Sequence, residues 1–157
     1  MPYSTFSEAQ IKSLIKAIDS DGYAVLPDWA SAAQLKDLQD LVIQTVAAAG
    51  NDYVALSGRQ AVQGTPLYDW GGSRDFIDLC RRITEGATGE RSSDTTLTQT
   101  LRCLTGDGGR KESLIFHYDS FVLTTIMPVF MPEGGERGDL LMLPNRRPLR
   151  HSYARNL

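Results

Sequence analysis

The tripeptide His117-Tyr118-Asp119 carries residue types that could hold a metal ion. It lies between two stretches typical of β-strands, residues 114–116 and 121–126. Residues i and i+2 of a strand point to the same face, so the imidazole and the carboxylate converge while Tyr118 points away. These are two of the three donors of a 2-His-1-carboxylate triad, which binds Fe(II) and leaves coordination positions open. The alternative for so short a motif is a histidine and an aspartate that hydrogen-bond to each other at the end of a strand.

A third metal ligand has few candidates in this chain. The sequence holds two histidines and two cysteines, and Cys80 and Cys103 form no CxxC pair. A closed structural zinc site, which needs four such ligands, is therefore disfavoured. His151 is the other histidine and could complete a triad with His117 and Asp119. The alternative is an exposed histidine in a basic tail.

Helical patterns occupy the first part of the chain. Capping boxes begin at Ser7 and Ser31, and each is followed by apolar residues at the spacing of one helical face. Together with Ser73, which precedes a similar pattern, they predict helices over 7–21, 31–50 and 73–86. A short strand is predicted at 23–26, whereas residues 51–72 give no clear prediction.

The pattern changes near residue 95. Period-two alternation and β-branched residues predict strands over 95–104, 114–116, 121–126 and 139–143, with glycine-rich turns at 105–109 and 133–138. Helices followed by antiparallel strands are typical of an α+β fold. We therefore predict one domain, 1–157, with a helical part, 1–94, and a sheet part, 95–157.

The composition excludes several classes of protein. Hydrophobic residues make up 41% of the chain and charged residues 22%, which is ordinary for a globular protein. A net charge of −3 argues against nucleic-acid binding. The sequence has no apolar run of roughly 18 residues, as a membrane span needs, and no signal-peptide pattern at its start. We expect a cytoplasmic protein that binds neither nucleic acid nor membranes.

Three segments together resemble a known family. They are Asp19-Ser20-Asp21-Gly22-Tyr23-Ala24-Val25-Leu26-Pro27, Phe116-His117-Tyr118-Asp119-Ser120 and Glu136-Arg137-Gly138-Asp139-Leu140-Leu141-Met142-Leu143-Pro144. The chain resembles the Fe(II)/2-oxoglutarate-dependent oxygenases, and among them the phytanoyl-CoA dioxygenase-like group.

The resemblance implies a fold, a chemistry and a set of site residues. The fold would be N-terminal helices packed on an antiparallel jelly-roll sheet of the double-stranded β-helix type. His117 and Asp119 would bind Fe(II), and O2 would oxidise a small organic substrate while 2-oxoglutarate is decarboxylated. Thr100 and Arg102 share one face of the preceding strand, where residues of the family contact the cosubstrate. The alternative for these two is an outward polar face.

The sequence departs from the family at the distal histidine. Residues 138–144 resemble a strand in the middle of the barrel, yet little chain follows for the distal ligand. Either the chain is the N-terminal part of a longer oxygenase with an incomplete sheet, or His151 completes a compact triad, with Arg150 or Arg155 as the carboxylate anchor. The alternative function is a catalytically silent fragment or cupin-like binding module. An incomplete sheet also predicts self-association through its open edge, whereas a hydrolase is disfavoured because no GxSxG motif appears.

Overall fold

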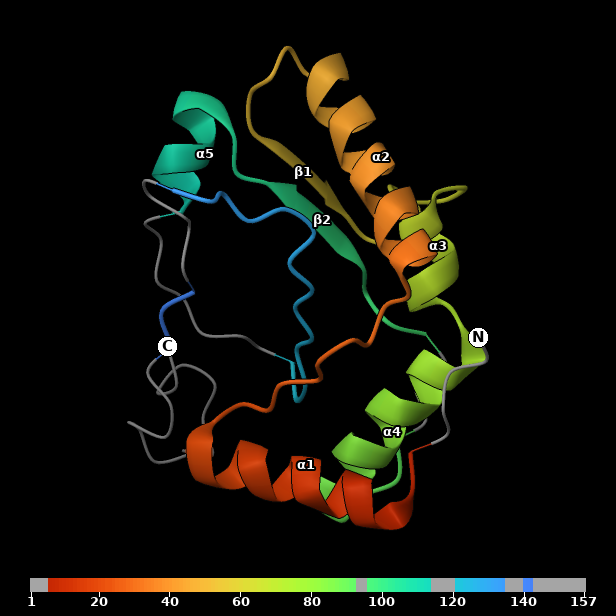
Figure 1. Ribbon diagram of the computed structural model, residues 1–157. Helices are drawn as coiled ribbons and strands as arrows, with labels where there is room; N and C mark the ends of the chain where they lie inside the picture. The colour runs from red at the N-terminus through yellow and green to blue at the C-terminus, as the bar shows by residue number, and fades with distance from the viewer. Residues whose placement is uncertain (1–5, 93–95, 114–120, 135–139, 143–157) are drawn as a thin grey trace, which may run out of the picture.

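The computed structural model describes residues 6–92, 96–113, 121–134 and 140–142. Within these ranges the chain forms five helices and one two-stranded antiparallel sheet (Figure 1). The elements in chain order are α1 (Glu8–Asp21), α2 (Ala32–Ala48), β1 (Val54–Ser57), α3 (Pro66–Gly71), α4 (Arg74–Thr88), β2 (Thr100–Cys103) and α5 (Gly106–Glu112).

Local capping determines where the first two helices begin, and both were predicted. The Ser7 and Ser31 side chains accept from the backbone N–H groups three residues later, which completes the two capping boxes. Gly22 ends α1 in the left-handed conformation, with φ 83°. Helix α4 was also predicted, but it passes through Gly86 and ends at Thr88.

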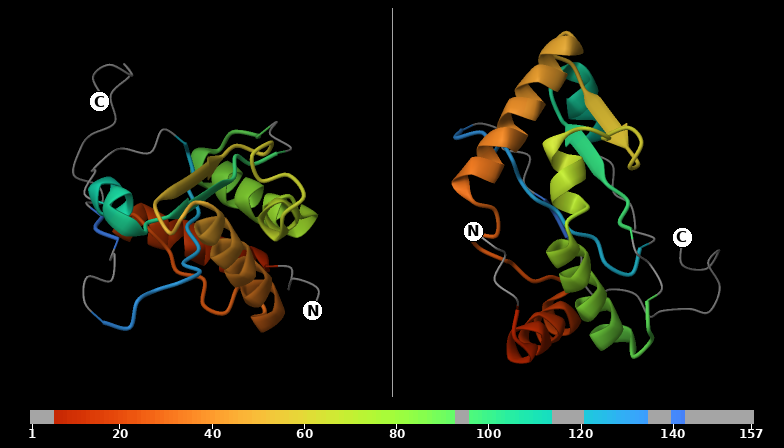
Figure 2. Two further views of the ribbon diagram at one scale, coloured as in Figure 1. Left: turned by 90° about the horizontal axis from the view of Figure 1, so that it is seen from above. Right: turned by 90° about the vertical axis from the view of Figure 1, so that its right-hand side faces the viewer.

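The main apolar core lies between α1 and α4. Ile11 of α1 is buried against Leu79 and Ile83 of α4, and partly buried apolar side chains surround this cluster. Figures 1 and 2 show α1 and α4 at one end of the molecule, with α2, the sheet and α5 toward the other. None of the helices in the described ranges is long and apolar enough to span a membrane.

The sheet pairs two strands that are far apart in sequence. β1 and β2 are antiparallel, with Val54 opposite Cys103 and Ser57 opposite Thr100. Exposure alternates along β2, so Leu101 and Cys103 are buried while Thr100 and Arg102 face outward.

The predicted jelly roll is wrong, because the described residues form a mostly helical structure with only these two strands. Residues 105–109, predicted as a turn, contain the start of α5 instead. Residues 23–26 and 121–126 form no strand, and neither do residues 140–142. The predicted strand at 114–116 lies outside the described residues.

Residues 121–130 contact the helices at a few points and pair with no strand among the described residues. Leu123 packs against the α1–α4 core, and the carbonyl of Val129 accepts a hydrogen bond from the Gln39 side chain (3.4 Å). Most apolar side chains of this segment are exposed, including Val122 and Ile126. Isolated contacts with the helices therefore take the place of the predicted strand pairing.

Candidate functional site

The predicted site residues fall into two groups. Thr100 and Arg102, the predicted cosubstrate contacts, both lie on β2. His117, Asp119 and His151, the predicted metal ligands, lie outside the described residues. The structure therefore shows the surroundings of the first pair only.

Thr100 and Arg102 share one face of β2, as the alternation predicted, and both are exposed on the outward side of the sheet. Ala55 is the register partner of Arg102, and Ser57 is that of Thr100. The hydroxyls of Ser57 and Thr100 lie 3.3 Å apart and share a hydrogen bond. The outward face thus presents two neighbouring hydroxyls and one guanidinium; we call Ser57, Thr100 and Arg102 the β2 face.

The Arg102 guanidinium already has a carboxylate partner. It forms an ion pair with Glu112 of α5 at 3.3 Å, and it lies 6.0 Å from the centre of the Tyr53 ring. The two charged side chains are 41% and 38% exposed. Exposed pairs of this kind contribute at most about 1 kcal/mol, because water screens both charges. A carboxylate ligand could therefore replace Glu112 at small cost.

Helix α5 is held against the start of β1 by Asp52. The carbonyl of Asp52 accepts from the Thr105 hydroxyl (2.7 Å), and its carboxylate accepts from the backbone N–H of Gly108 (3.3 Å). Gly109 packs on the backbone of Leu104, so a Cβ there would lie 2.8 Å from the Leu104 Cα. These contacts orient the helix that carries Glu112 and precedes the His117 segment.

Sequence reasoning missed Asp52 and Glu112 as parts of this site. Asp52 contacts Thr105 across 53 positions of the chain, and Glu112 pairs with Arg102 across 10 positions that include the start of α5. The one local signal was a glycine-rich stretch after β2, which suggested a turn instead of a helix.

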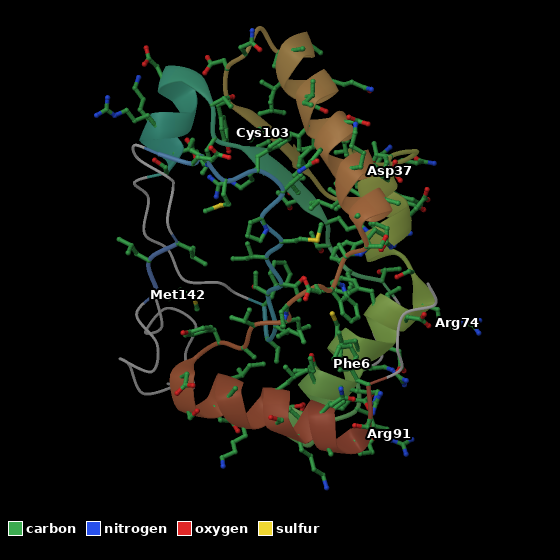
Figure 3. All side chains as sticks on the ribbon, viewed as in Figure 1. Phe6, Asp37, Arg74, Arg91, Cys103 and Met142 are labelled. Carbon is green, nitrogen blue, oxygen red and sulfur yellow. The ribbon has the colours of Figure 1, made fainter. Side chains whose placement is uncertain are left out.

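The two cysteines are not nucleophiles in this environment. Both are buried free thiols. Burial raises the pKa of Cys80 to about 11 and also raises the pKa of Cys103. Each thiol is therefore protonated at neutral pH, whereas nucleophilic attack and metal ligation need the thiolate. Figure 3 shows Cys103 on β2, on the strand that carries the β2 face.

Within the ranges that the structure describes, no three His, Cys, Asp or Glu side chains gather closely enough to hold a metal ion.

Comparisons with known proteins assign no family to this chain. No family model matches it, no curated protein is significantly similar to it, and no solved structure matches it. The resemblance to the oxygenases therefore rests on the residues themselves.

Proposed function

We propose that the chain takes part in the Fe(II)- and 2-oxoglutarate-dependent oxidation of a small organic substrate by O2. The observation that carries this proposal is the His117-Tyr118-Asp119 motif, which follows closely after the outward-facing cation Arg102. The motif supplies metal donors, and the guanidinium supplies a site for the carboxylate of a cosubstrate. The proposal depends on these residue types and not on a jelly roll.

The donor set has the chemistry that Fe(II) prefers in oxygenases. Two imidazoles, from His117 and His151, and one carboxylate, from Asp119, make up the 2-His-1-carboxylate combination. When bound, the iron supplies the oxidation chemistry that couples 2-oxoglutarate decarboxylation to substrate oxidation. The protein's part is to provide the ligands and to orient the cosubstrate.

Arg102 is the proposed carboxylate anchor. Its guanidinium can donate two parallel hydrogen bonds to a carboxylate, a geometry that Glu112 uses only in part, through one contact at 3.3 Å. The Thr100 hydroxyl lies on the same face and can donate a further hydrogen bond. Cosubstrate binding would therefore exchange the Glu112 carboxylate for that of 2-oxoglutarate.

An anaerobic titration with Fe(II) and 2-oxoglutarate tests this proposal through the visible charge-transfer band of the chelate. We expect a band in the wild type that is lost in His117→Ala and in His151→Ala. Arg102→Gln should need about threefold to fivefold more 2-oxoglutarate, because a carboxylate contact to an exposed guanidinium is worth at most about 1 kcal/mol. Asp37→Asn, on the exposed surface of α2, serves as the control.

The outcomes separate the enzyme from its alternative. A folded wild-type protein that gives no band would refute the proposal and leave the silent fragment or cupin-like binding module. A band that survives His151→Ala but not His117→Ala would keep the iron site and remove His151 from it.

A further inference from the structure

A hollow of about 400 Å³ lies between the N-terminal half of α1 and residues 26–29. Its size falls in the range of small-molecule sites, roughly 300–1,000 Å³. We call it the α1 hollow; it is lined by Phe6, Gln10, Ser13, Leu14, Leu26, Pro27, Asp28 and Trp29. Figure 1 shows α1 at the opposite end of the molecule from α5, so the hollow is separate from the β2 face.

One wall of the α1 hollow is aromatic and is held in place from behind. The Phe6 and Trp29 rings lie 5.3 Å apart, and Trp29 in turn lies 6.1 Å from Phe76 of α4. Arg82 of α4 donates to the carbonyl of Phe6 (2.7 Å) and pairs with Glu8 (2.6 Å). The wall is therefore organised before any ligand arrives, which lowers the entropic cost of binding.

The charged group in the lining is Asp28. Its backbone has φ 53°, a left-handed conformation that aspartate tolerates better than most residues and that is often found at ligand sites. The side chain is exposed and forms no ion pair with any residue in the described ranges. The lining of the hollow thus combines two aromatic residues with a carboxylate that has no ion-pair partner among the described residues.

We propose that the α1 hollow binds an alkylammonium ion, a primary amine on a short aliphatic chain. Aromatic faces attract cations, and a carboxylate accepts strong hydrogen bonds from an ammonium group. The Ser13 hydroxyl offers a further acceptor, while Leu14 and Leu26 provide apolar contact for the aliphatic part. An anionic ligand of the same size would be repelled by Asp28. This proposal does not depend on the oxygenase chemistry.

The test uses three ligands of similar shape and different charge. Ligand-observed NMR on the full chain would measure binding of n-butylammonium, 1-butanol and butyrate. We expect n-butylammonium to bind about threefold to fivefold more tightly than 1-butanol and butyrate not to bind, because an exposed charge pair is worth at most about 1 kcal/mol. Butyrate or 1-butanol binding as tightly as n-butylammonium would overturn the proposal.

A pair of matched variants locates the site. Asp28→Asn keeps the size and the left-handed preference of the side chain while removing its charge. It should weaken n-butylammonium binding about threefold to fivefold, to the level of 1-butanol. Asp37→Asn removes the same charge from α2, away from Phe6 and the hollow (Figure 3), and should leave binding unchanged. Equal affinity in wild type and Asp28→Asn would also overturn the proposal, and the ligand series decides the matter even if Asp28→Asn fails to fold.

Discussion

Removing Leu79 from the α1–α4 interface should destabilise the whole chain. Leu79 is 4% exposed and packs with Ile11 and Ile83 in the central cluster. Leu79→Ala removes three carbon atoms, which at roughly 0.8 kcal/mol each loses about 2.4 kcal/mol of transfer free energy. The cavity left behind raises the loss in unfolding free energy to about 3–4 kcal/mol, within the range of about 2–5 kcal/mol typical of such changes.

Urea unfolding followed by circular dichroism measures this loss. With an m-value of about 2 kcal/mol/M, the midpoint should fall by about 1.5–2 M. Ile43→Ala is the control, because Ile43 lies on α2 with 57% of its surface exposed and should change stability by less than about 0.5 kcal/mol. If both variants lose the same stability, or if Leu79→Ala is neutral, α1 and α4 do not pack as described.

Four further outcomes follow from the structure. Gly109→Ala should lower the free energy of unfolding by about 1–2 kcal/mol in urea melts, because its Cβ would press on the backbone of Leu104. Gly134→Ala should leave it unchanged, because a Cβ at Gly134 would meet no atom within 4 Å. Ser31→Ala should lower the free energy of unfolding by about 1 kcal/mol, because it removes the cap of α2. Ser73→Ala should lower it by less than about 0.5 kcal/mol, because Ser73 makes no cap hydrogen bond. Equal losses in urea melts would contradict the cap assignment. The pKa of Cys80 is about 11 in the folded protein and about 9 in the unfolded chain, so the stability that this difference contributes is complete below pH 9 and is lost as the pH rises toward 11. The free energy of unfolding should therefore fall over this pH range. The fall should be less steep in Cys80→Ala. Finally, the outer edges of β1 and β2 carry no strand among the described residues, so sedimentation should detect concentration-dependent self-association, and a monomer at high concentration would contradict it.

Features set by neighbouring residues were predictable from the sequence. The capping boxes at Ser7 and Ser31 join residues three apart, so the signals for these helix starts lie within one turn. That Thr100 and Arg102 share one face follows equally from the alternation of a strand, and the exposure pattern of β2 confirms it.

Features set by distant residues were not predictable. Helix α5 begins where glycines suggested a turn, because Thr105 and Gly108 bond to Asp52, more than 50 positions earlier. The register of β1 on β2 and the pairing of Glu112 with Arg102 also depend on tertiary contacts. The jelly roll was inferred by resemblance, and the predicted strand at 121–126 contacts the α1–α4 core through Leu123 instead of pairing with a strand of the described residues.

The most direct test of the central claim is the stoichiometry of Fe(II) binding to the full chain under anaerobic conditions. Equilibrium dialysis followed by iron analysis should find one tightly bound ion per wild-type chain, and none in His117→Ala or Asp119→Ala. Asp37→Asn should bind as the wild type does. A folded wild-type chain that binds no iron, or a His117→Ala variant that binds it equally well, would contradict the account.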